Sequence, residues 1–459
     1  MAYNFRECDR DQLFLFPPSM REWLPKDHLV WFILDAVDQL DLSPFLRRYR
    51  ADGWGRAAYP PRMMVALLVY AYCSGVRSSR KIERACQENI AFRVITGGQV
   101  PDHTTIARFR QYFQEELAEL FTEVLWLCGR AGLVKVGTVV VDGTKIAGNA
   151  SLSRNRTYKH LEEEVARMLR EAEEADAAEE GMEGEGGIPG ELADREKRLE
   201  KLRRAKEELE RLAEEEAAER ERELREEGEG SGKRKRGRKP KPPDPRPDPG
   251  AKVNLTDPES RIMKTRRGYV QGYNAQLVVT VDQIIVAAEV TQDQNDVRQL
   301  HPMLKRTEEE LERAGIGKKP KVAVADAGYF SEKNITGAGE DGPELVVAPC
   351  GEERLRRKLV EEGPPRGRIP QGLSAKELME RKLLTKRGRE RYGLRKVTVE
   401  PVVGQLKALG DRFLRRGLKA VRSEFRLLCA CNNLLKLWRA VKAGIARWVG
   451  SWDPLPQVG

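Results

Sequence analysis

The stretch "TVVVDGTKIAGNAS", residues 138–151, opens with four residues typical of a strand and then meets Asp142. β-Branched residues in a short apolar run predict a strand that is buried in a sheet. A carboxylate is costly to bury without a partner, so an aspartate at this place is either solvated at the strand end or held there for chemistry. Other parts of the sequence decide between these two interpretations.

A second apolar strand ends in the same way. In "KVAVADAGYFSE", residues 321–332, the apolar run stops at Asp326. Residues 266–292 predict two strands joined by a short turn, a helix follows from Asn295, and "PELVVAPC" predicts a short fifth strand. In a mixed sheet whose first and fourth strands are adjacent and parallel, Asp142 and Asp326 emerge at one edge, where ligands bind in open α/β sheets.

Two carboxylates at one sheet edge repel each other unless a cation lies between them. Magnesium is the expected ion, because it prefers oxygen ligands and keeps waters that substrate phosphates can replace. "RKVTVEPVVGQLK", residues 395–407, supplies Glu400 as a third carboxylate. Proline is tolerated in the first turn of a helix, so Pro401 predicts that Glu400 begins one. Lys407 lies seven residues further on and returns to nearly the same helix face.

Residues 1–130 predict an all-α domain, with caps and glycine stops around several apolar helical segments. The middle of this region reads as a helix, turn, helix series, which is the outline of a DNA-binding module. A scaffold or dimer role is the alternative. Six basic residues of this series are expected to be exposed, Arg80 and Arg108 being the main candidates for DNA contact: Arg77, Arg80, Lys81, Arg84, Arg108 and Arg110.

An acidic segment interrupts the strands. Residues 161–230 hold 27 Asp and Glu against 13 Lys and Arg, and leucines recur in them at heptad spacing. We expect a helical hairpin that buries its leucines within itself or against a second copy. The leucines of the stripe are Leu192, Leu199, Leu202, Leu209 and Leu212.

Residues 231–251 are basic and then rich in proline, so they cannot bury themselves and are expected to be disordered when free. Within them "RGRKP" resembles the core of an AT-hook, in which arginines such as Arg236 and Arg238 enter an A·T minor groove. A solvated linker that touches phosphates without sequence preference is the alternative that we favour.

Composition narrows the class of protein. The net charge is +10, and residues 351–459 alone hold 26 Lys and Arg against 11 Asp and Glu, which favours a polyanionic partner. No apolar run reaches the length of a membrane span, and the N-terminus has no signal region, so a cytoplasmic, nucleoid-associated protein is expected. Seven cysteines without repeated spacing fit a reducing compartment, and the pair Cys429 and Cys431 favours helix packing over metal binding.

The sequence resembles the DDE transposases of bacterial insertion sequences. The resemblance runs through "DGTKIAGNAS", "SRIMKTRRGYVQGYNAQ", "QDQNDVRQLHPML", "VADAGYFS" and "YGLRKVTVEPVVGQLK". It is closest to the branch with a Tyr, Arg, Glu, Lys signature, in the group numbered eleven-eighty-two. The resemblance implies an α/β fold class: an RNase H-like mixed-sheet catalytic domain with an N-terminal all-α domain and a helical coiled-coil insertion. The predicted boundaries are 1–130 for the N-terminal domain, 135–152 and 252–445 for the catalytic domain, 153–230 for the insertion and 231–251 for the linker.

By this resemblance Asp142, Asp326 and Glu400 form a catalytic triad that binds Mg²⁺, with Mn²⁺ as a substitute. The signature also implies that Tyr392, Arg395 and Lys407 hold DNA phosphates. One spacing departs from the signature, which has three residues between Arg and Glu where this chain has four, so that Lys396 stands at the expected position. We keep Arg395, because a lysine is a poor replacement for a bidentate phosphate clamp.

The implied reaction is two-metal phosphoryl transfer on double-stranded DNA, in which one ion activates the attacking oxygen and the other stabilises the leaving oxygen. Water frees a 3′-hydroxyl at the element end, and that hydroxyl attacks target DNA. A homodimer is expected, since joining two ends needs two active sites. The alternatives are an RNase H-like nuclease without strand transfer, an inactive or regulatory DNA-binding derivative, and a structural coiled-coil protein.

Overall fold

The computed structural model describes residues 19–50, 57–179, 190–230, 243–265, 267–337, 339, 342–370 and 372–452. The chain divides into two compact units. The first comprises Met1–Leu133 with Ala430–Gly459, and the second comprises Val134–Cys429. The residues from 430 to 445, which we expected in the catalytic domain, therefore group with the N-terminal helices.

The first unit is helical, as predicted, within its described residues. Its core helix α3 begins at a proline, which is favourable in the first turn, and buries ten of its thirteen residues. Helix α6 begins at Asp102, whose carboxylate accepts hydrogen bonds from the N–H groups of Thr104 and Thr105. The α-helices of this unit are α1 (Leu29–Gln39), α2 (Ser43–Leu46), α3 (Pro61–Cys73), α4 (Ser79–Glu88), α5 (Ile90–Thr96), α6 (His103–Tyr112) and α7 (Gln114–Arg130), with the end of α15 (Leu418–Lys442).

Two arginines of the N-terminal series are not exposed as we expected. Arg77 and Arg110 are buried. The Arg110 guanidinium donates to the carbonyl of Arg77 at 2.7 Å, to the hydroxyl of Tyr72 at 3.2 Å and to Ser79. The backbone carbonyl and the hydroxyls replace water around this charge, so Arg110 ties helices together.

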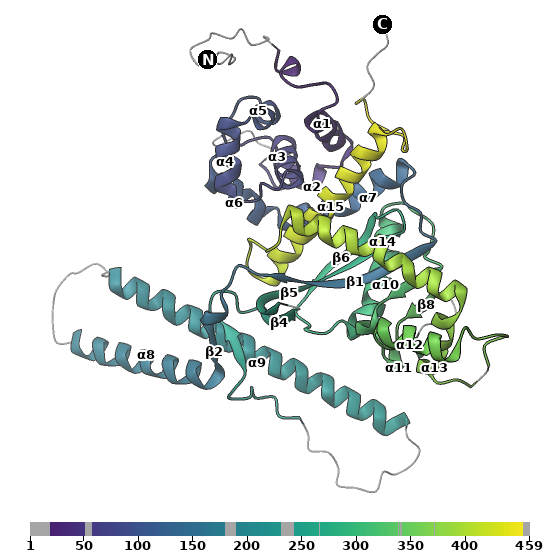
Figure 1. The fold of residues 1–459 in the computed structure, drawn as a ribbon. Coiled ribbons are helices and arrows are strands. Elements are labelled where there is room, and N and C mark those ends of the chain that lie inside the picture. The colour runs from purple at the N-terminus through teal and green to yellow at the C-terminus, as the bar shows by residue number, and fades with distance from the viewer. Residues whose placement is uncertain are drawn as a thin grey trace, which may run out of the picture. The chain divides into compact units, whose positions relative to one another are not determined.

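The second unit contains a mixed sheet in the strand order β4-β5-β1-β7-β8, with β6 also paired to β5 (Figure 1). Strand β1 is antiparallel to β5 and parallel to β7, and β7 is parallel to β8. The expected adjacency of the first and fourth predicted strands is confirmed. The strands of this sheet are β1 (Thr138–Ala147), β4 (Arg261–Thr265), β5 (Gly268–Thr280), β6 (Ile285–Thr291), β7 (Val322–Ala325) and β8 (Glu344–Val347). Strand β4 was not predicted.

Helices follow and cover the strands. Helix α10 (Leu300–Arg313) packs against β5 and β6, and α14 (Lys386–Leu409) crosses β1, β7 and β8 (Figure 1). Short helical turns shape the sheet edge, η3 (Val297–Gln299) before α10 and η4 (Ala327–Tyr329) after β7. The remaining helices of this region are α11 (Glu332–Thr336), α12 (Glu352–Glu362) and α13 (Ala375–Leu384).

The expectation that Glu400 begins a helix is wrong. Helix α14 continues from Lys386 to Leu409, with Pro401 inside it. Proline lacks the N–H that would donate to the carbonyl of Val397 four residues earlier. The Nε2 of Gln283, in the β5–β6 turn, donates to that carbonyl at 2.8 Å instead. A tertiary hydrogen bond thus replaces the missing helical one, which helps the helix to pass through the proline.

The insertion forms the predicted helical hairpin, α8 (Tyr158–Glu179) and α9 (Gly190–Gly230), and Figure 1 shows the two helices side by side. Of the leucine stripe, Leu202 and Leu209 are buried, whereas the side chain of Leu192 lies outside the described residues. The hairpin does not bury its stripe by itself, because Val253 belongs to the same cluster. This valine lies in β3 (Lys252–Asn254), which pairs with β2 (Asn155–Thr157) at the base of the hairpin.

An ion pair further connects the hairpin to the sheet. Glu208 of α9 accepts from the guanidinium of Arg261 in β4 at 2.7 Å, and both side chains are at most 15% exposed. Near the end of α9, Glu219 pairs with Arg298 of η3 at 2.7 Å. The insertion is therefore a docked part of the second unit.

Candidate active site

The sheet register places two carboxylates at one edge. Val141 of β1 is paired with Ala325 of β7 in parallel, so the next residues, Asp142 and Asp326, lie side by side where β7 ends. The expectation that the first strand stops at Asp142 is wrong, because β1 stays paired with β5 and continues to Ala147. Each aspartate is turned back onto its own chain, because the N–H of Gly143 donates to Asp142 at 2.8 Å and the N–H of Gly328 donates to Asp326 at 2.8 Å.

The guanidinium of Arg395 lies among the three predicted catalytic carboxylates. Its Nη1 is 3.3 Å from Oδ2 of Asp142 and 3.8 Å from Oδ2 of Asp326, and its Nη2 is 3.6 Å from Oε1 of Glu400. The side chain of Arg395 is 15% exposed, whereas that of Glu400 is 52% exposed. The structure thus gathers Asp142, Asp326 and Glu400 around one cation.

The electrostatics follow from this crowding. Burial and the nearby charge of Asp326 raise the pKa of Asp142 to about 6, although Arg395 and the N–H of Gly143 act in the opposite direction. Burial by itself would lower the pKa of Arg395, but the surrounding carboxylates, Asp142 first, raise it. Burial likewise raises the pKa of Tyr392 to about 12. The cluster holds excess negative charge, which a cation relieves.

Because α14 is continuous, its register also determines which basic side chain lies among the three carboxylates. Lys396, which stands where the signature's arginine is counted, pairs with Glu352 at 2.7 Å. Arg395 approaches Tyr392 one turn earlier, with its guanidinium carbon 5.8 Å from the ring centroid. Arg395 and Tyr392 therefore belong to the triad's surroundings, and the extra residue of spacing does not bring Lys396 among the three carboxylates.

The other predicted DNA-binding residues lie away from the triad or outside the described structure. Lys407 is exposed on α14, two turns beyond Glu400. Arg80 on α4 and Arg108 on α6 are exposed in the first unit. Arg236 and Arg238 lie outside the described residues.

Two carboxylates near the triad were not predicted. Glu352, at the start of α12, is 3.8 Å from Nη2 of Arg395. Asp296 is the second; its Oδ1 accepts from Lys145 at 3.0 Å and from the amides of Asn274 and Gln276 at 2.7 Å each. The sequence offered a weak signal for Asp296, since the segment "QDQNDV" follows a strand and is rich in polar residues. Nothing local distinguishes Glu352 from its neighbouring glutamates.

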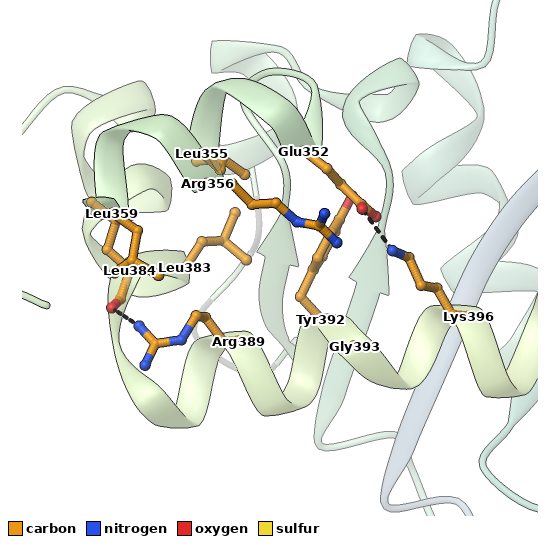
Figure 2. Close-up of a pocket in the computed structure, with 10 residues that line it drawn as sticks. All are labelled: Glu352, Leu355, Arg356, Leu359, Leu383, Leu384, Arg389, Tyr392, Gly393 and Lys396. Carbon is orange, nitrogen blue, oxygen red and sulfur yellow. Dashed lines mark hydrogen bonds and ion pairs between the residues drawn. The ribbon is translucent and has the colours of Figure 1, made fainter. Parts of the chain in front are cut away.

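A cavity of about 240 Å³ lies beside the triad, between α12, α13 and α14 (Figure 2). Leucines line it together with the cations Arg356, Arg389 and Lys396 and the carboxylate of Glu352. Tyr392 also lines the cavity, as Figure 2 shows. The side of α14 that carries Tyr392 therefore joins the cavity to the carboxylate cluster.

Comparison with protein families gives two matches. The model described as "Transposase domain (DUF772)" matches residues 18–112, and the model described as "Transposase DDE domain" matches residues 228–434. The chain is a DDE transposase. The second match includes Asp326 and Glu400 but begins after Asp142, which reaches them through the pairing of β1 with β7. A search of curated proteins and a search of solved structures each gave no match.

DDE transposases use a divalent metal ion, and the oxygen donors of this site suit one. Three carboxylates converge on the transposase's own Arg395, so the residues fit a cation at this place. As they stand, no three His, Cys, Asp or Glu side chains among the described residues are close enough to hold a metal ion. A metal ion held by these three carboxylates would take the place of the guanidinium. No helix in the described part of the transposase is long and apolar enough to cross a membrane.

Proposed function

We propose that this transposase binds the terminal inverted repeats of an insertion sequence, cleaves at the element ends and transfers the 3′-hydroxyl ends to target DNA. The observation that carries the proposal is the convergence of Asp142, Asp326 and Glu400 on Arg395 from three separate segments. A structural role for these carboxylates would not need Glu400, which is half exposed. The Tyr, Arg, Glu, Lys signature supports the corresponding branch, for which we propose the group numbered eleven-eighty-two.

In this proposal Asp142, Asp326 and Glu400 hold Mg²⁺, or Mn²⁺ in its place. Bound at the triad, the ion supplies Lewis-acid stabilisation of the oxygens of the transferring phosphoryl group. The protein positions the three carboxylates that hold the ion. Strands β1 and β7 place the two aspartates side by side, and α14 brings Glu400 to them. Arg395 is released from the carboxylates and, with Tyr392, binds a DNA phosphate near the cut.

Lys407 binds a second phosphate two turns along α14, and Arg80 and Arg108 bind DNA from the first unit. These contacts position DNA without holding metal, so Lys407→Ala should weaken cleavage less than loss of a triad residue. Because they neutralise phosphates, binding of end DNA should weaken steeply as salt rises. The acidic helices α8 and α9 are repelled by phosphates and do not contribute to this salt dependence of DNA binding.

The first experiment measures cleavage and binding of end DNA separately. Asp142→Asn, Asp326→Asn and Glu400→Gln should each abolish Mg²⁺-dependent cleavage and preserve binding of end DNA. Full cleavage by any one of these variants removes that residue from the site. Lys319→Ala, which alters a surface ion pair of the same unit with Glu308, serves as the control and should cleave normally.

The second candidate function is an RNase H-like nuclease that hydrolyses but does not join. Strand transfer from a pre-cut end bearing a 3′-hydroxyl separates the two, since only a transposase joins that end to target DNA. An active complex with two chains per pair of joined ends is expected for the proposed homodimer. Sedimentation with end DNA tests this, and one chain per pair of ends would contradict it.

A further inference from the structure

A polar cluster lies beside the segments that carry the two aspartates, the middle of β1 and the turn that follows β7. Its centre is Oδ1 of Asp296, which accepts three hydrogen bonds: from Nζ of Lys145 at 3.0 Å and from the amides of Asn274 and Gln276 at 2.7 Å each. Asn274 and Gln276 are fully buried, and the side chain of Lys145 is 15% exposed. A charged acceptor with three buried or nearly buried donors is a fixed arrangement rather than a solvated surface contact.

The cluster is connected to both catalytic strands. In the β1–β5 register Gln276 is opposite Gly143, and Asn274 is opposite Lys145. Alternate residues of a strand face opposite sides, so Gly143 and Lys145 face Asp296 while Asp142 faces Arg395. Strand β1 is therefore contacted on both of its faces around Asp142.

The connection to β7 runs through Tyr329. Its hydroxyl donates to Oε1 of Gln276 at 2.5 Å, and its ring is fully buried. Tyr329 lies three residues after Asp326, in the turn η4. The same amide, Gln276, thus contacts Asp296 through its nitrogen and the Asp326 turn through its oxygen.

The backbone also leaves room for Asp296. A Cβ on Gly143 would be 2.7 Å from Oδ1 of Asp296, and a Cβ on Gly328 would be 3.6 Å from Oδ2. Gly143 directly follows Asp142, and its lack of a Cβ lets the Asp296 carboxylate approach the backbone of β1 closely, whereas at Gly328, two residues after Asp326, the distance is an ordinary van der Waals contact.

We propose that Asp296, paired with Lys145, is a positioning residue of the transposase that sets the separation of Asp142 and Asp326. It does so without binding DNA, acting through Gln276 and the backbone at Gly143. The proposal rests on the proposed function, because it takes the two aspartates as catalytic. Loss of the carboxylate leaves the amides and Lys145 without their shared acceptor, and β1 at Gly143 and the turn η4 lose their common anchor.

The experiment compares single-turnover cleavage at saturating end DNA, the Kd for end DNA and the melting temperature, all in the full chain. Asp296→Ala should slow cleavage at least tenfold, change the Kd less than twofold and retain a cooperative melt. Asp296→Asn keeps an oxygen acceptor but leaves the charge of Lys145 without a counter-charge. Cleavage by this variant should therefore slow less than cleavage by Asp296→Ala. Adding Lys145→Met to Asp296→Asn removes that stranded charge and should recover part of the rate.

Three outcomes overturn the proposal. The first is wild-type cleavage by Asp296→Ala. The second is slow cleavage by both Asp296 variants together with loss of their cooperative melt, because unfolding would then explain the lower rate. The third is strictly additive effects of the changes at Lys145 and Asp296. Asp142→Asn is measured alongside: if it cleaves, the proposed function fails, whereas if it is inactive and Asp296→Ala is normal, only this inference fails. Glu308→Ala, which removes the acidic partner of the exposed Lys319, is the matched control and should leave all three measurements unchanged.

Discussion

Removal of Arg395 should destabilise the transposase without metal and increase its response to magnesium. The guanidinium is 15% exposed and within 3.3 to 3.8 Å of Asp142, Asp326, Glu400 and Glu352. Loss of one partner from a largely buried ion pair costs about 3 to 5 kcal/mol. We expect the lower end, about 3 kcal/mol for Arg395→Ala, because water reaches Glu400 and relieves part of the repulsion. At about 2 °C per kcal/mol, the melting temperature should fall by about 6 °C.

Magnesium tests the cause of that loss. In the wild type the ion competes with Arg395 for the carboxylates, whereas in Arg395→Ala it meets them without a competitor. A ligand that binds only the folded state raises stability in proportion to the logarithm of its concentration over its Kd. Melting curves recorded with and without MgCl₂ should therefore show a larger rise for the variant than for the wild type.

Arg391 provides the matched control on the same helix. It lies one turn before Arg395, its side chain is 19% exposed, and it pairs with Glu344 alone at 2.5 Å. Arg391→Ala should also lower the melting temperature, but magnesium should raise it no more than in the wild type. Equal magnesium responses in the Arg395 and Arg391 variants would refute the inference that a metal ion takes the place of Arg395.

Three further predictions concern other parts of the molecule. Gly143→Ala places a Cβ 2.7 Å from Oδ1 of Asp296, and the overpacking should cost about 1 to 3 kcal/mol and slow cleavage in the end-DNA assay. Glu208→Ala leaves Arg261 without its acidic partner and should destabilise the second unit by about 3 kcal/mol in urea unfolding. Burial lowers the pKa of Lys436 to about 8, so the unfolded state binds more protons between about pH 8 and 10, and stability should rise with pH there. Lys436→Met should abolish that rise and increase the melting temperature at pH 7.

Controls make these three predictions specific. Glu221→Ala breaks an exposed pair with Arg225 on the same helix as Glu208 and should cost only a few tenths of a kcal/mol. Gly404→Ala, in α14, adds a Cβ that meets no atom within 4 Å and should leave cleavage unchanged. If stability changes equally with pH in the wild type and Lys436→Met, the assigned effect of burial is wrong.

Local sequence pattern predicted most of the elements. The apolar runs before Asp142 and Asp326 predicted strands β1 and β7, because a buried strand needs apolar side chains on both faces. The heptad leucines gave the helical hairpin, and Leu202 and Leu209 are buried in it. Strand β4 was not predicted because its sequence, "RIMKT", has two basic residues among five and lacks a clear strand pattern. It forms a strand by pairing with β5.

The exposure of charged residues was less predictable. Arg77 and Arg110 have the sequence context of surface arginines, yet both are buried. The partners of Arg110 include Tyr72 and Ser79, which lie on other segments, so the sequence of a single helix does not reveal its burial. Likewise, Val253 completes the core of the hairpin from a strand that lies beyond the hairpin's own sequence.

The sequence by itself determined that three carboxylates follow strands or lie on a helix in an order suited to one site: Asp142, Asp326 and Glu400. Only the tertiary structure decided that Arg395 rather than Lys396 lies among them, because α14 continues through Pro401 and keeps its register. Periodicity records which face a residue has on its own element. It does not record contacts with other elements, such as the hydrogen bond from Gln283 to the carbonyl of Val397 that accompanies the passage of α14 through Pro401.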